Sequence, residues 1–323
     1  MAPTLGAMRK RSGRMLSLVI PMHDEADSLA VLFHRLDKTV KPLGLDLEII
    51  CVDDGSQDET YERLVERART DPRLKLVALT RNFGKEAALT AGIEAATGDM
   101  VVPLDADLQD PPELIGEFIS LWEQGYDVVY GVRADRASDT PMKRFSAGAF
   151  YRLFNRLSDF PIPESTGDFR LMDRAVVTAL AQLPERNRFM KGLFAWVGFR
   201  QVGVPYVRPA RAAGATSWRY FSLFRFAIDG LTAFTTLPLK VWTGVGVAAA
   251  FLALGFAAVI IIQVLVSGRD VPGYASLMVV ILFGFALQMI ALGVLGEYIG
   301  RMYQEVKGRP IYLVRDRVGF DDT

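Results

Sequence analysis

Two aspartates separated by one residue follow a short apolar run in the first half of the chain. Residues 100–104 read MVVPL, Asp105 and Asp107 come next, and Asp110 with two prolines ends the run. Such a run, closed by turn residues, is typical of a buried strand in a parallel sheet, whose carboxyl end is where ligands bind. Side chains alternate along an extended chain, so both carboxylates face the same way. Two such oxygen ligands suit Mg²⁺ or Mn²⁺ carrying a diphosphate.

Two further polar clusters end earlier apolar runs. Residues 21–25 read PMHDE and residues 52–58 read VDDGSQD. In a parallel sheet these clusters lie at the same edge as Asp105, where their carboxylates can accept hydrogen bonds from a nucleobase and from ribose hydroxyls. The alternative for the second cluster is a turn with a helix cap, supplied by Ser56 or Asp58. No Gly-x-Gly-x-x-Gly or Walker sequence is present, which excludes the usual dinucleotide and P-loop sites.

The elements that must position these residues are predicted from hydrophobic periodicity. Apolar runs alternate with helical patterns up to about residue 132, which predicts an α/β domain with a mostly parallel sheet and helices on both faces. The predicted strands are 16–22, 47–52, 74–79, 100–104 and 128–131, and the predicted helices are 28–40, 58–69, 85–96 and 112–124. Further along, we predict helices at 143–157 and 175–183, strands at 168–172 and 201–207, and a loop at 208–217.

Two long segments near the carboxyl end carry no charged residue. Residues 241–266 and 271–296 are each long enough to cross a hydrocarbon core, which needs about 20 residues. Two buried helices of a soluble domain would need more polar residues on at least one face. Residues 218–237 are rich in aromatic side chains and are predicted to lie in the membrane interface. Gln263 and Gln288 are the strongly polar residues within the spans, so no charged relay suggests a pump or a channel.

Charge and composition narrow the class of protein. The 37 basic and 37 acidic residues balance, so no overall field favours nucleic acid. Cys51 is the single cysteine and lies in an apolar run, which predicts a buried, inert thiol. Positive residues flank both spans, at Arg219, Arg225 and Lys240 before the first and Arg301, Lys307, Arg309 and Arg315 after the second. The positive-inside rule therefore places both chain ends in the cytoplasm.

Several stretches, taken in order, resemble the inverting glycosyltransferases of family two, which have a Rossmann-like GT-A fold. The first four are IPMHDEADSL, VDDGSQDET, RNFGKEAALTAG and DADLQDPPE. The later stretches STGDFRLMDR, ERNRFMKGLFAWVG, RAAGAT, DGLTAF and VLGEYIG resemble the polyprenyl-phosphate branch, which includes the bactoprenol (undecaprenyl-phosphate) glucosyltransferases and is related to dolichol-phosphate mannose synthase. The likeness runs from about residue 15 to residue 309.

The resemblance implies a role for individual residues. The nucleotide-sugar positions are Pro21, His23, Glu25, Asp53, Asp54, Lys85, Asp105 and Ala106, with His23 and Asp24 replacing the commoner Tyr and Asn. The implied metal site comprises Asp105, Asp107 and Gln109, and the implied acceptor-phosphate site comprises Arg133, Lys143, Arg144 and Arg211. The family usually has a lysine where this chain has Ser217, which leaves the acceptor role of that loop open.

The implied catalytic residues are Asp168, Asp107 and Arg133. Asp168 occupies the position proposed as catalytic base, although a lipid phosphate with a second pKa near 6 is already largely dianionic at neutral pH. Asp168 could instead orient the acceptor or the sugar hydroxyls.

The resulting expectation is a metal-dependent enzyme of the inner (plasma) membrane that transfers glucose from UDP-glucose to undecaprenyl phosphate on the cytoplasmic side, and the resemblance suggests a tetramer. Mannose transfer from GDP-mannose, or a non-catalytic membrane-anchored binding protein, are the alternatives. The expected organisation is a basic tail (1–14), a cytosolic GT-A domain (15–217), interface helices (218–237), two transmembrane helices (about 241–266 and 274–296, within 238–300) and a cytosolic tail (301–323).

Overall fold

The computed structural model describes residues 14–134, 166–186, 188–207, 237–267 and 273–320. The chain divides into two compact units, one formed by Met1–Ala227 with Pro310–Thr323 and the other by Ile228–Arg309. The predicted helix at 143–157 and all but the last residue of the predicted interface helices at 218–237 lie outside the described residues, as do Lys143, Arg144 and Arg211.

The first unit contains an eight-stranded sheet with the order β7-β5-β6-β4-β1-β2-β3-β8. Its strands are β1 (Met15–Met22), β2 (Asp46–Asp53), β3 (Leu74–Leu79), β4 (Met100–Pro103), β5 (Val128–Arg133), β6 (Thr166–Asp173), β7 (Gln201–Tyr206) and β8 (Val314–Val318). Strands β4, β1, β2 and β3 are parallel neighbours, whereas β6 runs antiparallel to both β4 and β5. The predicted mostly parallel α/β domain of GT-A type is therefore confirmed.

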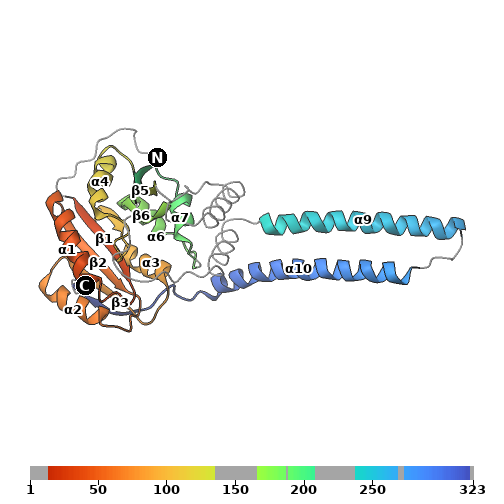
Figure 1. Cartoon of the computed structure of the whole chain (residues 1–323), viewed down its shortest axis with the longest axis horizontal. Coiled ribbons are helices and arrows are strands. Elements are labelled where there is room, and N and C mark those ends of the chain that lie inside the picture. Colours follow the sequence, from red (N-terminus) through yellow and green to blue (C-terminus); the bar gives the residue numbers. More distant parts are fainter. Residues whose placement is uncertain (1–13, 135–165, 187, 208–236, 268–272, 321–323) are drawn as a thin grey trace. The chain divides into compact units, whose positions relative to one another are not determined.

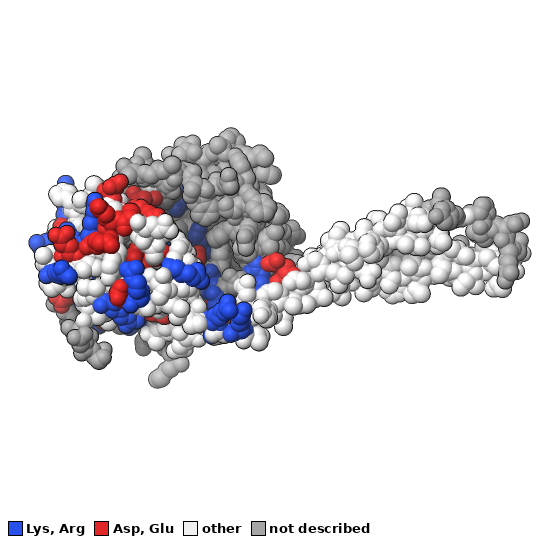
Figure 2. Space-filling view, turned by 90° about the horizontal axis from the view of Figure 1, so that it is seen from below, with Lys and Arg blue, Asp and Glu red and all other residues white. Residues whose placement is uncertain are grey.

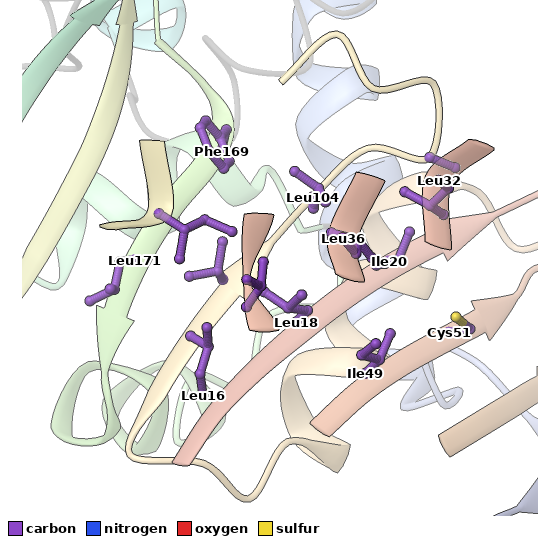
Figure 3. Close-up of a cluster of buried hydrophobic side chains, with 14 of the residues drawn as sticks. Leu16, Leu18, Ile20, Leu32, Leu36, Ile49, Cys51, Leu104, Phe169 and Leu171 are labelled. Carbon is purple, nitrogen blue, oxygen red and sulfur yellow. The ribbon is translucent and has the colours of Figure 1, made fainter. Parts of the chain in front are cut away.

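Helices cover both faces of this sheet (Figure 1). They are α1 (Leu29–Thr39), α2 (Thr60–Thr70), α3 (Lys85–Ala95), α4 (Ile115–Glu123), α6 (Arg174–Ala181) and α7 (Met190–Trp196), with short 3₁₀ turns at Lys41–Leu43 and Pro112–Leu114. Side chains alternate between the two faces along β1, and Leu16, Leu18 and Ile20 belong to the same buried cluster as Leu32 and Leu36 of α1 (Figure 3). On the opposite face α3 packs so closely that a Cβ at Gly92 would lie 2.3 Å from Cγ1 of Val19.

The helices α1, α2 and α4 each contribute fully buried apolar side chains to the hydrophobic core. Phe118 of α4 packs on Phe169 of β6 with their ring centroids 4.9 Å apart. Cys51 of β2 is completely buried, and burial raises the pKa of its thiol. The predicted burial of the thiol is confirmed.

The second unit contains two long apolar helices, α9 (Leu237–Ser267) and α10 (Tyr274–Lys307). The segments Val241–Val266 and Leu277–Lys307 are long and apolar enough to cross a membrane. Their surfaces carry no charged side chain over most of their length in Figure 2. The helix α10 continues past residue 296 for three charged turns, which include Glu297, Arg301 and Lys307.

Strand β8 was not predicted. It lies in the expected carboxyl-terminal tail and pairs antiparallel with β3, where Val77 faces Arg317 and Ala78 faces Asp316. Its sequence VRDRV places three consecutive charged residues between two valines, and such charges suit a strand at the edge of a sheet.

Candidate functional site

The carboxyl ends of β1, β2 and β4 bring the three polar clusters of the sequence to one edge of the sheet. In the parallel register, Met22 at the end of β1 faces Asp53 at the end of β2, and Leu104 donates its backbone N–H to Val19 of β1. Burial raises the pKa of Glu25, and the nearby carboxylates of Asp107 and Asp105 raise it further. Repulsion among these carboxylates favours a bound cation.

The loops after β1 and β2 are joined by hydrogen bonds. The Asp24 backbone N–H donates to Oγ of Ser56 at 3.0 Å, and the Gln57 N–H donates to Oδ1 of Asp24 at 2.7 Å. Asp24 adopts a left-handed backbone conformation with φ of 55°, which is strained for a residue with a side chain. The paired loops therefore form one rigid wall of the site.

Asp54 holds the loop that follows β3. Its Oδ1 accepts the Phe83 N–H at 2.7 Å and its Oδ2 accepts the Gly84 N–H at 2.9 Å. The same loop lies so close to Gly55 that a Cβ there would be 2.5 Å from the Arg81 carbonyl carbon. A glycine is thus required at position 55, where φ is also +66°. Asp54 shapes this loop, a role that sequence patterns did not predict.

Asp53 keeps one carboxylate oxygen available. Its Oδ1 accepts the Ser56 N–H at 3.1 Å, while its Oδ2 is buried and has no hydrogen-bond partner among the described residues. A buried oxygen of this kind is costly unless something donates to it. An N–H or hydroxyl donor of a nucleoside would satisfy it.

Lys85, the first residue of α3, lies between two carboxylates from different strands. Its Nζ is 2.7 Å from Oδ1 of Asp105 and 2.8 Å from Oδ2 of Asp168. Burial acts to lower the pKa of Lys85, but attraction to Asp168 and Asp105 outweighs this and raises it. The ammonium group therefore stays charged and links the end of β4 to β6.

Asp168 is ionised despite its burial. Desolvation acts to raise its pKa, but the charges of Lys85, Lys191 and Arg170 lower it to about 2. Its Oδ1 has no hydrogen-bond partner among the described residues. Nearby, burial and repulsion by Asp168 raise the pKa of Glu86 to about 7, and the Glu86 carboxylate accepts the Met190 N–H at 3.2 Å.

The segment after β4 provides oxygen ligands. Asp107 Oδ1 accepts the Gln109 backbone N–H at 3.1 Å, and Oε1 of Gln109 is buried with no partner among the described residues. Leu108 between them has a left-handed φ of 55°, and Ala106 is buried. Within the described ranges, no three His, Cys, Asp or Glu side chains are grouped so that they could hold a metal ion by themselves. Two carboxylates and an amide oxygen nonetheless fit Mg²⁺ or Mn²⁺, because such ions take one or two carboxylates with substrate phosphates.

Arg133 is held at the other side of the site through Tyr206. The guanidinium donates to the Tyr206 oxygen, and the Tyr206 hydroxyl donates to Oδ1 of Asp110 at 2.8 Å. Burial, together with Asp110, raises the pKa of Tyr206 to about 12, so the hydroxyl keeps its proton. A Cβ at Gly167 would lie 3.3 Å from Nη2 of Arg133, and Nε of Arg133 has no partner among the described residues. The guanidinium can therefore still bind an anion.

A hollow of about 770 Å³ lies elsewhere, at the amino ends of β1, β2 and β3. Its charged side chains pair with one another: Arg73 lies 2.8 Å from Asp37 and 2.7 Å from Asp71. Nε of Arg67, which lines this hollow, also lacks a partner among the described residues. Such atoms gather at the carboxyl ends of the strands, however, on Asp53, Asp168 and Arg133, and we therefore take that edge as the candidate site.

Comparison with known proteins identifies the family. Residues 17–180 match the model of glycosyl transferase family 2. The chain belongs to this family. It is 53% identical over 306 residues to an uncharacterized glycosyltransferase of Synechocystis sp., with 95% of this chain and 96% of that protein covered.

Two further relatives of this family 2 glycosyltransferase have more specific names. A prophage-derived bactoprenol glucosyl transferase of Shigella flexneri is 44% identical over 300 residues, covering 93% of this chain and 97% of the relative. A prophage bactoprenol glucosyl transferase homolog of Escherichia coli K12 is 43% identical over 300 residues, covering 93% and 98%.

In this glycosyltransferase most of the residues predicted from the sequence to form the site lie around the edge of the sheet where β1, β2 and β4 end. The charges of Asp105 and Asp107 act on Glu25. Ion pairs join Lys85 to Asp105 and to Asp168. His23 Nδ1 lies 3.0 Å from the Asp54 carbonyl oxygen, which ties it to the second strand end. Pro21 is part of β1, opposite Val52. The individual roles assigned to these residues stay predictions.

Sequence reasoning missed several residues that shape the site. They are Glu86, Asp110, Arg170, Lys191 and Tyr206. Arg170 is buried, with its guanidinium 3.9 Å above the Phe194 ring, and its Nη2 donates to the Gly167 carbonyl at 2.9 Å. A buried charge inside the predicted strand at 168–172 was the available signal, because arginine is rarely buried without a partner.

Proposed function

We propose that this glycosyltransferase transfers glucose from UDP-glucose to the phosphate of undecaprenyl phosphate, with inversion at the anomeric carbon. The observation that carries the proposal is the identity of 43–44% with proteins named bactoprenol glucosyl transferase over 93% of the chain. Bactoprenol is the polyprenyl lipid of the implied acceptor. The product would be a polyprenyl-phosphate glucose used to modify a glycan of the cell envelope.

The apolar helices support a lipid acceptor. Val241–Val266 and Leu277–Lys307 give the chain a hairpin long enough to span a bilayer. Arg301 and Lys307 lie in the last turns of α10 and Arg309 follows that helix, and by the positive-inside rule these charges support a cytoplasmic catalytic domain. An enzyme anchored this way works at the membrane surface, where the phosphate of a polyprenyl lipid lies.

Donor binding is assigned to the ends of β1, β2 and β4. The partnerless Oδ2 of Asp53 would accept a hydrogen bond from the nucleoside, beside the wall formed by the paired loops after β1 and β2, which include His23 and Asp24. Asp105, Asp107 and Gln109 would hold Mg²⁺ or Mn²⁺, which supplies positive charge to the leaving diphosphate when bound. Lys85 adds a second positive charge at the same place.

Asp168 is better suited to positioning than to proton transfer. A pKa of about 2 makes it a very weak base at neutral pH. Because the acceptor phosphate is already largely dianionic, it needs no base before it attacks the anomeric carbon. We assign Asp168 to orienting Lys85 and a sugar hydroxyl, and Arg133 to binding the acceptor phosphate. Position and electrostatics would then supply most of the rate enhancement.

Incubating the purified full-length protein with undecaprenyl phosphate, Mn²⁺ and a panel of labelled sugar nucleotides tests the proposal. We expect organic-soluble label from UDP-glucose. Label from GDP-mannose alone would refute the donor and keep the acceptor, whereas label from no donor would refute the proposed reaction. Analysis of the product by NMR should give the β anomer from an α-linked donor, because a single displacement inverts the configuration.

A further inference from the structure

The unpredicted strand β8 belongs to a segment, residues 310–320, that contacts the β3–α3 connection of the site. Beyond the ladder between β3 and β8, the Thr80 N–H donates to the Leu313 carbonyl at 2.9 Å. Thr80 is the residue that directly follows β3, so the pairing extends to the start of the loop 80–84. We call residues 310–320 the C-terminal segment.

The same segment also contacts the far end of α3. The Tyr312 hydroxyl donates to Oε2 of Glu94 at 2.6 Å, and Nη2 of Arg188 lies 3.8 Å from Oε1 of Glu94. Burial and the Glu94 charge raise the pKa of Tyr312, so its hydroxyl remains a donor. The C-terminal segment therefore contacts the connection at two places, before the loop at Thr80 and in the last turn of α3.

Side chains fix the register of β8. The Tyr61 hydroxyl donates to Oδ2 of Asp316 at 3.1 Å, and the Arg315 guanidinium lies 4.2 Å above the Tyr61 ring. Both contacts reach α2, which packs beside β3. A strand held by its neighbours in this way keeps one register instead of slipping along the edge.

The loop between these contacts has its own local contacts through Arg81, which donates to the Asn82 carbonyl at 2.9 Å and lies 4.0 Å above the Phe83 ring. Arg81 and Asn82 are exposed, and on the inner side the loop is held by the two hydrogen bonds to Asp54. It leads directly into Lys85, whose ammonium group lies between Asp105 and Asp168. A shift of Thr80 or of α3 would therefore move Lys85 relative to both carboxylates.

We propose that the C-terminal segment is a positioning element for the donor site: it fixes the loop 80–84 and Lys85 from the outer edge of the sheet. The proposal relies on the proposed function only for the identity of the ligand, a nucleoside diphosphate. Its consequence is that residues following the second apolar helix control donor binding, although Tyr312 and Leu313 contact none of the predicted nucleotide residues directly.

Hydrogen exchange without any substrate tests the proposal. The test variant ends at Arg309 and keeps both apolar helices, and the matched control lacks only residues 321–323. We expect the Phe83 and Gly84 amides, whose acceptor Asp54 is untouched, to exchange at least tenfold faster in the test variant. The amides of β5 and β6, across the sheet, should keep their protection. Unchanged exchange at Phe83 and Gly84, or equal acceleration in β5 and β6, would overturn the positioning role.

Nucleotide binding gives a second readout on the same proteins. With Mn²⁺ present, we expect the test variant to bind UDP at least tenfold more weakly than the control, and a synthetic peptide of residues 310–320 to restore part of the affinity. Equal affinities would contradict the proposal. If the control itself binds no UDP, the proposed donor is wrong, and the exchange experiment still decides the positioning role.

Point variants distinguish the effect of losing one contact from the effect of losing the whole C-terminal segment. Tyr312→Phe removes the hydroxyl that reaches Glu94, whereas Glu94→Gln keeps an oxygen acceptor. We expect Tyr312→Phe to raise the KM for the donor severalfold with little change in kcat, and Glu94→Gln to stay near the wild type. A fall in kcat alone for Tyr312→Phe would assign it a different role.

Discussion

Replacing Lys85 by glutamine tests the charge balance of the site. Nζ of Lys85 lies 2.8 Å from Asp168, whose side chain is 15% exposed, and the pKa of Asp168 is about 2 instead of its ordinary 3.8. A shift of nearly two pKa units corresponds to about 2–3 kcal/mol in favour of the ionised carboxylate. Lys85 is the first of the charges that lower this pKa, ahead of Lys191 and Arg170, so removal of its charge should cost a large part of that amount.

The pH dependence has a definite sign. The folded-state pKa of Asp168 is lower than the unfolded one, so its stabilisation is fully present above about pH 4 and is lost as the pH falls through 2. In Lys85→Gln the first of the charges that lower the pKa of Asp168 is lost while its burial stays, so this pKa rises. The ionised carboxylate then stabilises the variant less at neutral pH, and the difference from the wild type shrinks as the pH falls.

Thermal unfolding of the full-length protein in detergent measures the effect. For a domain of this size, about 2–3 kcal/mol corresponds to a Tm loss of roughly 5–10 °C. We expect this loss at pH 7, a smaller loss at pH 4.5, and a near-normal Tm for the control Lys85→Arg, which keeps the charge. A Tm unchanged at pH 7, or an equal loss at both pH values, would refute the proposed role of the Lys85 charge.

Three other substitutions probe separate parts of the molecule. Asp107→Asn should reduce transfer at least a hundredfold without preventing membrane insertion, as measured by labelled lipid product and by membrane fractionation. Tyr206→Phe removes a donor to the buried Asp110 and should lower stability by about 1–3 kcal/mol and weaken acceptor binding, measured as Tm and as the KM for undecaprenyl phosphate. Gly92→Ala places a Cβ 2.3 Å from Val19 and should lower stability by about 1–3 kcal/mol, measured by denaturant unfolding.

Each of these three predictions has a result that would contradict it. Full transfer by Asp107→Asn would contradict its metal role. A Tyr206→Phe variant with normal Tm and KM would mean that Arg133 does not depend on the hydroxyl. Gly116→Ala is the control for Gly92→Ala, because the nearest atom to a Cβ at Gly116 is a Leu43 methyl at 3.5 Å and alanine favours a helix. Equal destabilisation by both substitutions would argue against close packing of α3 on β1.

The parallel core was predictable from the sequence because burial leaves a local pattern. Strands such as β1 and β2 are buried on both faces and form apolar runs, and each run ends in polar turn residues at the site edge. The strand bounds agree within one or two residues for these elements. Arg133, expected just after the fifth strand, is its last residue, which still places it at the end of β5.

Contacts between distant segments could not be predicted in the same way. Asp54 is hydrogen-bonded to a loop 29 and 30 residues further on, and Tyr206 reaches Asp110 across 96 residues. The helix α7, which was not predicted, has the sequence MKGLFAW, and its glycine weakens the helical pattern. The edge strand β8 has three consecutive charged residues between two valines and lacks the apolar run that marks a buried strand.

The buried thiol of Cys51 makes this chain a convenient background for site-specific labels. Maleimides react with thiolates, and Cys51 is fully enclosed with a raised pKa. Cysteines introduced at exposed positions such as Val31 in the catalytic domain and Val306 in α10 would therefore take up label selectively in the otherwise natural chain. Spin labels at such a pair would measure the distance between the domain and the hairpin, with and without substrates.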